Sequence, residues 1–235
     1  MRARRTAGNW PATEAEAVAE QNRLRELADT AGPGPAPGEA RTIAGVDVAY
    51  DEATGRLAAA AVVLDAETLE PVAEATATGR AAFPYIPGLL AFRELPPVLD
   101  ALARLPEPPA LVVCDGYGLA HPRRLGLAAH LGVLTGIPSF GVAKTPFGFA
   151  FEPPGPERGA ASPLLDGAEE VGRALRTREG VKPVFVSVGH GISLEHAVAH
   201  TLRLTPRYRL PETTRRADSL CRRTLTAALA DITRA

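Results

Sequence analysis

A carboxylate at a predicted strand end, followed by glycines and cationic side chains, is the feature of this chain that most clearly suggests chemistry. The apolar run 111–114 predicts a buried strand, and Asp115 ends it. Two glycines then allow the backbone to turn and to approach a ligand closely. The glycines and the cationic residues that follow are Gly116, Gly118, His121, Arg123 and Arg124. A carboxylate in this setting is suited to hold a hard metal ion beside a phosphate.

Asp47 provides a second carboxylate on another predicted strand. Residues 42–50 are rich in β-forming residues, and Asp47 lies between Val46 and Val48. An unpaired carboxylate is costly to bury, so one interpretation places Asp47 on the solvent side of a half-buried strand. The other interpretation makes it a metal ligand, and the presence of Asp115 at the end of another predicted strand favours that interpretation.

A stiff apolar tip is predicted at residues 84–87. Pro84 and Pro87 bracket Tyr85 and Ile86, and the two proline rings restrict the backbone on both sides.

Apolar residues then recur at helical spacing and predict a helix over about 88–104. Pro96 and Pro97 are expected to distort this helix or to restart it. Glu94 falls near its start, where the helix dipole alone would favour an acid.

These segments together resemble the endonuclease V family, the deoxyinosine 3′-endonucleases. The matching stretches are 45–47, 84–94, 115–126, 141–144, 189–194 and 210–218. They are long, occur in order and cover about residues 41–220. The resemblance implies an α/β fold with a ribonuclease-H-like mixed sheet, in which an antiparallel meander is extended by parallel βα units and flanked by helices.

The resemblance also implies roles for single residues. Asp47, Glu94 and Asp115 match the family's catalytic carboxylates, and Asp218 matches a fourth position beside the metal. His121 and Lys144 match catalytic residues next to the scissile phosphate.

Further residues match the family's substrate-binding positions. The tip at 84–87 matches a wedge that fills the gap left by a displaced base. A pocket for hypoxanthine, lined by backbone, is implied at Gly88, Leu90, Gly116 and Gly118. Arg123 and His190 complete the expected substrate-binding set, although His190 could also serve only to fix its own loop.

The activity implied is a metal-dependent nick that recognises deaminated adenine. Water attacks phosphorus at the second phosphodiester bond on the 3′ side of the lesion, which leaves a 5′-phosphate and a 3′-hydroxyl in a DNA repair reaction. Because the donors are oxygens, we expect Mg²⁺, with Mn²⁺ as a substitute. Two alternatives stay open: another ribonuclease-H-like nuclease such as a junction resolvase, and an inosine-binding module without cleavage.

The charges are distributed unevenly along the 235 residues. Residues 1–118 hold 10 Lys and Arg against 17 Asp and Glu, a balance of −7, and residues 119–235 hold 16 against 10, a balance of +6. Clustered cations suit a phosphate backbone, although such charges also occur on solvated helix faces. The expected partner is DNA containing deoxyinosine, with inosine-containing RNA as a second candidate and no membrane. We expect a monomer.

The chain is predicted to have an N-terminal helix and a Pro/Gly linker over residues 1–40, followed by a single nuclease domain over 41–235. Thr13 and Glu16 form a capping-box pattern that opens a helix to about residue 28. Strands are predicted at 41–50, 56–65, 72–80, 110–114 and 138–142, with further strands within 168–188. Helices are predicted at 88–104, 122–134, 193–203 and 211–231, and a long loop at 146–163.

The cysteines and the hydropathy pattern indicate the cellular compartment in which the protein works. Cys114 and Cys221 are the two cysteines, and neither belongs to a metal-binding spacing. The longest apolar run, 57–64, is too short to span a bilayer. We therefore expect two reduced thiols and a cytoplasmic protein.

Overall fold

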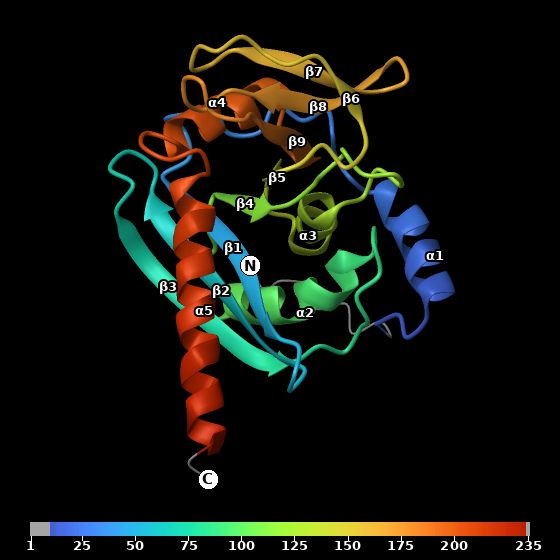
Figure 1. Cartoon of the computed structure of the whole chain (residues 1–235), viewed down its shortest axis with the longest axis vertical. Helices are drawn as coiled ribbons and strands as arrows, with labels where there is room; N and C mark the ends of the chain where they lie inside the picture. Colours follow the sequence, from blue (N-terminus) through green and yellow to red (C-terminus); the bar gives the residue numbers. More distant parts are fainter. Residues whose placement is uncertain (1–9, 234–235) are drawn as a thin grey trace.

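A nine-stranded mixed sheet forms the centre of the computed structural model, which describes residues 10–233 (Figure 1). From one edge to the other, the strands are β3 (Pro71–Arg80), β2 (Arg56–Asp65), β1 (Thr42–Asp51), β4 (Leu111–Asp115), β5 (Ser139–Ala143), β9 (Val184–His190), β8 (Glu169–Leu175), β7 (Ala161–Asp166) and β6 (Ala150–Phe151). Strands β1, β4 and β5 are parallel, and the other pairs are antiparallel. The predicted meander extended by parallel βα units is confirmed.

Five helices surround this sheet in the described part of the chain. They are α1 (Glu14–Arg25), α2 (Leu90–Ala103), α3 (Leu127–Thr135), α4 (Leu194–Leu204) and α5 (Glu212–Thr233). Helices α2 and α3 pack on one face of the sheet, whereas α4 and α5 pack on the other. Figure 1 shows α5 running along the strands β1–β3.

The alternation of side chains along β1 and β4 decides which face each residue serves, because successive side chains point to opposite faces of a strand. Ala44 and Val46 join the cluster under α2 and α3. Ile43 and Val113 join the cluster on the opposite face, under α4. By this alternation, the odd-numbered residues at this end of β1 and β4 face the side that carries α4 and α5.

Helix α2 keeps both prolines inside one continuous helix, so the expected restart is not found. A proline at position 96 cannot donate to the carbonyl of Phe92, four residues earlier. The indole N–H of Trp10 takes that place and donates to the Phe92 oxygen at 2.7 Å. A distant side chain therefore satisfies an acceptor that the helix leaves open.

Two further expectations need correction. Helix α3 begins at Leu127 rather than at 122, because Arg124 has a left-handed backbone with φ 56° and Gly126 forms the helix N-cap. The segment predicted as a loop at 146–163 contains β6 and the start of β7, which pair with each other at the far edge of the sheet. The other predicted strands and helices are present with bounds shifted by a few residues.

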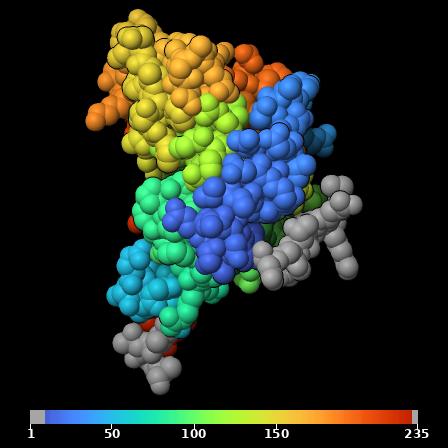
Figure 2. Space-filling model, turned by 90° about the vertical axis from the view of Figure 1, so that its right-hand side faces the viewer, coloured from blue at the N-terminus to red at the C-terminus, as the bar shows by residue number. Residues whose placement is uncertain are grey.

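The N-terminal helix lies on the surface of the rest of the described chain rather than apart from it (Figure 2). Its capping box is formed, since Thr13 accepts from the Glu16 amide while Glu16 accepts from the Thr13 amide. The buried residues Ala17 and Leu24 pack into clusters shared with the rest of the chain. Residues 1–9 of the predicted N-terminal unit lie outside the described residues.

The two cysteines are free and buried, as expected for reduced thiols. Within residues 10–233, no helix has the length and apolar character needed to cross a membrane.

Candidate active site

Asp47 and Asp115 lie side by side at the point where β4 ends. Val46 pairs with Cys114 in the parallel register of β1 and β4, so the next residues, Asp47 and Asp115, stand level with each other. Both belong to the odd-numbered series and face the side of the sheet that carries α5. The face around Asp47 is therefore covered, and the interpretation that places it on an open solvent face is wrong.

Helix α5 brings Asp218 to Asp47 because its first turn lies directly against β1. A Cβ atom on Gly45 would come within 2.2 Å of the Thr213 backbone, so only glycine permits this approach. Ligand atoms of Asp47, Asp218 and Cys221 lie within 4.8 Å of one another. Asp218 also forms an ion pair with Arg222, with 2.7 Å between Oδ1 and Nε.

Glu94 reaches the same cluster from α2. It stands in the second turn of the helix and is only 9% exposed, so it is not a simple acid of the first turn. The hydroxyl of Tyr50 donates to its Oε1 at 3.2 Å. Arg93, the next residue in the chain, pairs with Glu52 at 3.2 Å and stacks over the Tyr50 ring rather than bonding to Glu94.

The carboxylates are short of positive charge. Burial and the neighbouring charge of Asp115 raise the pKa of Asp47 to about 7. Burial and the charge of Asp47 raise the pKa of Glu94 to about 8. Acids held close together in this way favour the binding of a cation, which would offset their mutual repulsion.

The donor atoms fit a hard divalent cation. Carboxylate oxygens are the ligands that Mg²⁺ and Mn²⁺ prefer. Burial, followed by the charges of Asp47 and Asp218, raises the pKa of the Cys221 thiol to about 12, so this sulfur stays protonated. Its S–H donates to the Asp218 carbonyl at 3.2 Å. The cluster therefore offers oxygens, and its one sulfur is not in the form that binds metals.

Lys144, a cation that the sequence predicted for the site, pairs with one of these acids. It follows the end of β5 and its Nζ lies 2.5 Å from Oδ2 of Asp115. Half of its side chain is exposed, so it can reach both the carboxylate and a ligand that arrives from solvent.

A pocket of about 210 Å³ opens beside the acids. Besides Asp115, six of the predicted site residues line it, namely Tyr85, Pro87, Gly88, Leu90, Gly116 and His121. Asp115 lines it too, and so joins the pocket to the carboxylate cluster. Gly116 has a φ of 145°, which L side chains rarely adopt, so this turn requires glycine.

Gly118, predicted as a pocket residue, lies instead against β9. A Cβ atom there would fall 2.0 Å from the Val188 carbonyl oxygen, and its amide donates to the Ser187 hydroxyl at 2.9 Å. The structure therefore gives Gly118 a packing role behind the pocket wall.

The predicted tip has one outward and one inward side chain. Tyr85 is 67% exposed, whereas Ile86 packs against the buried cluster that contains Phe83 and Phe92. The tip is therefore anchored through Ile86 and presents Tyr85 to solvent.

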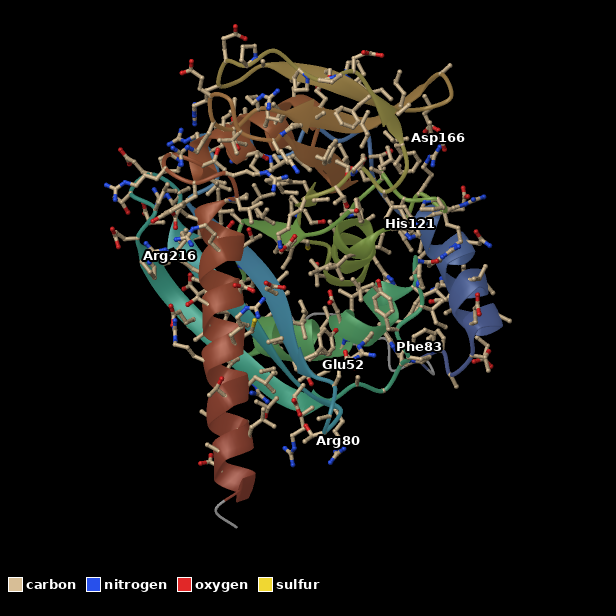
Figure 3. The ribbon with its side chains drawn as sticks, in the orientation of Figure 1. Glu52, Arg80, Phe83, His121, Asp166 and Arg216 are labelled. Carbon is tan, nitrogen blue, oxygen red and sulfur yellow. The ribbon has the colours of Figure 1, made fainter. Side chains whose placement is uncertain are left out.

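His121 and Arg123 both point to the Gly88 carbonyl. The His121 Nε2 lies 3.0 Å from it, and the Arg123 Nη2 donates to it at 2.8 Å. Both ring nitrogens of His121 are engaged, because Nδ1 accepts from the Arg123 amide at 3.1 Å. The side chain of Arg124 turns away and pairs with Asp166 and Glu169, and Figure 3 shows His121 and Asp166 on the same side of the molecule.

His190 fixes a loop. Its Nδ1 accepts from the Asp29 amide at 3.0 Å, as the second interpretation of this residue required. His196 and His200, whose spacing could hold a metal, bond instead to the carbonyls of Pro33 and Pro35. These three histidines attach the Pro/Gly linker to the domain.

Several residues of the site were not predicted, and three of them bear polar or aromatic contacts. Gln21 of α1 and Phe147 line the pocket, and Tyr50 contacts Glu94. Phe147 has a left-handed φ of 52°, which sequence patterns do not reveal. Gln21 is the one polar residue among the buried positions of α1, and that contrast was the available signal.

Comparison with known proteins agrees with this geometry. A sequence model of the Endonuclease V family matches residues 25–219. A protein of Streptomyces avermitilis named Endonuclease V is 66% identical over 226 residues, which cover 96% of this chain and 98% of that protein.

Solved structures give the same result. A crystal structure of the Streptomyces avermitilis Endonuclease V superimposes with a TM-score of 0.91 at 66% identity, covering 94% of this chain and 96% of the other. The Ciona intestinalis Endonuclease V has a TM-score of 0.80 at 28% identity over 91% of this chain and 98% of its own, and was crystallised with a 24mer DNA that contains an inosine followed by a ribo-adenosine.

Proposed function

The chain belongs to the endonuclease V family and is an endonuclease, and from this premise we propose that it recognises deoxyinosine in DNA and nicks the same strand at the second phosphodiester bond on the 3′ side. The products are a 5′-phosphate and a 3′-hydroxyl, and the damaged base stays attached to its sugar. The physiological process is the repair of deaminated adenine.

One observation carries the proposal: Asp115 belongs both to the carboxylate cluster and to the wall of the pocket. A base held in the pocket therefore places the adjoining backbone close to the acids. Recognition and cleavage share one residue, which a binding module without catalysis would not need.

The residues proposed to hold Mg²⁺, with Mn²⁺ as a substitute, are Asp47, Glu94, Asp115 and Asp218. When bound, such an ion supplies Lewis-acid activation of water and neutralises charge on the phosphate. Asp47 and Glu94 must lose their protons for this, and their raised pKa values make the process dependent on pH.

Lys144 is proposed to act on the phosphate. Its ammonium group is held at Asp115, from which it can turn toward a phosphate oxygen and stabilise the negative charge that develops there. His121 and Arg123 are proposed to support substrate binding indirectly, by holding the pocket wall at Gly88, since both bond to the Gly88 carbonyl.

Base recognition is proposed to combine the tip with the pocket. The exposed Tyr85 would enter the base stack while hypoxanthine turns into the pocket beside Gly88, Leu90 and Gly116. The Ciona intestinalis relative, crystallised with inosine-containing DNA, supports this choice of substrate.

A nicking assay tests the proposal. Duplexes with and without one deoxyinosine are incubated with the protein in Mg²⁺ or in EDTA, and the nick is mapped on a denaturing gel. We expect cleavage only of the inosine strand and only with Mg²⁺, and loss of at least about 100-fold in rate for Asp47→Asn. A single-stranded RNA arm with inosine tests the second substrate. Equal cleavage of both duplexes, or specific binding without any nick, contradicts the proposal.

A further inference from the structure

The backbone carbonyl of Gly88 is bonded by three side chains, one from α1 and two from the segment that follows β4. Gln21 Nε2 donates to it at 2.9 Å, Arg123 Nη2 donates at 2.8 Å, and His121 Nε2 lies at 3.0 Å. Gly88 stands where the tip at 84–87 joins α2, and it lines the pocket. Three donors on one carbonyl exceed its two lone pairs, so this oxygen is saturated.

Gln21 has the most connections within this group. It comes from α1, is 1% exposed, and lines the pocket. Its second amide hydrogen donates to the Leu125 carbonyl at 3.2 Å, and its Oε1 accepts from Arg123 Nε at 2.5 Å. The amide orientation is determined by these partners, because the reverse orientation would turn an oxygen toward two carbonyl oxygens.

The other two members are fixed as well. The Nδ1 of His121 accepts from the Arg123 amide, so the ring proton resides on Nε2 and is donated to Gly88. Burial lowers the pKa of His121 to about 4, which keeps the ring in this neutral form at neutral pH. The Gly88 junction is thus clamped between α1 and the 121–125 segment.

We propose that Gln21 is a positioning residue for base recognition: it holds the Gly88 junction, and with it one wall of the pocket, in place before the substrate arrives. The proposal rests on the function proposed above. A wall ordered during folding costs no ordering free energy on binding, and this favours the base that fits. The N-terminal helix is then part of the recognition apparatus, as its place beside the domain surface allows (Figure 2).

The variant Gln21→Glu tests this role with little change of shape. It removes both N–H donors, to Gly88 and Leu125, and keeps an oxygen for Arg123. Asn22→Ala is the matched control, because Asn22 is the next residue of α1 and is exposed. Dissociation constants are measured in EDTA for an inosine duplex and for an undamaged duplex of the same sequence. Single-turnover rates at saturating inosine duplex and Mg²⁺ are measured in parallel.

We expect Gln21→Glu to lower the preference for the inosine duplex by about tenfold, because the bond to Gly88, one of the two that the variant removes, no longer holds the pocket wall. The saturating single-turnover rate should stay within about twofold of wild type, and Asn22→Ala should match wild type in both measurements. A purely structural role would instead weaken binding to both duplexes alike and lower the saturating rate.

Two outcomes separate this inference from the proposed function. If the wild-type protein shows no preference for inosine, the proposed function fails. If wild type prefers inosine and Gln21→Glu keeps the full preference, the positioning role alone is overturned. Should Gln21→Glu fail to fold, Arg123→Lys is used instead. It keeps the charge but replaces the two guanidinium nitrogens that bond to Gln21 and to Gly88 with a single ammonium nitrogen, and the same loss of preference is expected.

Discussion

Asp47 has other acids close to it: Asp115 beside it in the sheet, Asp218 on α5, and Glu94 on α2. No lysine or arginine is bonded to Asp47, which accepts only the amide of Val48 within the described chain. The nearest cation that acts on it, Lys144, is paired with Asp115. Such an arrangement is unfavourable for the empty protein and is explained by the cation that the site is proposed to bind.

Asp218 has two partners, and each suggests a different role. Its oxygen lies near that of Asp47, which suggests a metal ligand, and it pairs with Arg222 one turn later on α5. We expect Asp218→Asn to raise the Mg²⁺ concentration needed for half-maximal cleavage by about tenfold, because one anionic donor is lost. The measurement is a Mg²⁺ titration of the nicking rate.

Arg222→Ala is the control for Asp218. It removes the ion pair and leaves the carboxylate in place, so the Mg²⁺ midpoint should stay the same or fall slightly. If instead Arg222→Ala and Asp218→Asn shift the midpoint equally, Asp218 acts through its ion pair and is not a ligand.

At the level of elements, the tip at 84–87 combines an anchored base with an exposed end. Tyr85→Ala should weaken binding to an inosine duplex by about tenfold while changing the affinity for undamaged duplex less. Since Tyr85 is 67% exposed, the thermal midpoint of the Tyr85→Ala variant should stay within about 1 °C of wild type. Ile86→Ala, on the buried side of the tip, should lower the midpoint. A loss of stability in Tyr85→Ala would contradict this assignment.

Helix α2 depends on a contact outside itself. Trp10→Phe keeps an aromatic ring beside Phe92 and His130 but leaves the Phe92 carbonyl without its donor. We expect the free energy of unfolding to fall by about 1–3 kcal/mol, the cost of an unsatisfied buried acceptor. Denaturant unfolding of the purified protein measures the change.

A double-mutant cycle isolates this hydrogen bond. Pro96→Ala restores a backbone N–H that can reach the Phe92 carbonyl, so Trp10→Phe should cost about 1 kcal/mol less in that background. An equal cost in both backgrounds would show that Trp10 stabilises α2 by packing alone.

For the whole molecule, apolar runs, apolar residues at helical spacing, and turn and capping residues were sufficient to predict most strands and helices. The apolar run 57–64 lies in β2, and the Thr13 and Glu16 pattern marks the start of α1. The failures have physical causes that residue patterns do not reveal, one distant in the chain and one local. The indole of Trp10 keeps α2 continuous across its prolines, and the left-handed Arg124 delays α3.

The site was predicted unevenly for the same reason. The two strand acids, Asp47 and Asp115, were found because their residue type and their place in an apolar strand are visible locally. The sequence did not show which arginines are available to bind a phosphate and which are engaged within the protein. Arg158, Arg176 and Arg209, for example, donate to backbone carbonyls of their own chain. Gln21 was missed because its three partners, Gly88, Arg123 and Leu125, lie more than 60 residues away.

The acids and the histidines make opposite contributions to the pH dependence of stability. Burial lowers the pKa of His121 to about 4 and that of His130 to about 3, so these residues favour unfolding as pH falls below about 6.5. Asp47 and Glu94, with pKa values raised to about 7 and 8, hold protons in the folded protein that the unfolded chain has released. Folding stability without metal therefore falls as pH rises toward 8, and above pH 6.5 the histidines no longer contribute.

The interval from about pH 6.5 to 8 therefore isolates the carboxylates. In EDTA, we expect the thermal midpoint of wild type to fall by about 5 °C across this interval, a change on the order of 2 kcal/mol. Glu94→Gln should fall less, because it lacks one of the titrating groups and keeps an oxygen for Tyr50. Since Mg²⁺ competes with these protons, the midpoint gained on adding Mg²⁺ should be larger at pH 8 than at pH 6.5. A gain of equal size at both pH values would show that the acids bind the ion without releasing protons, and that the charges in this cluster are compensated by other groups.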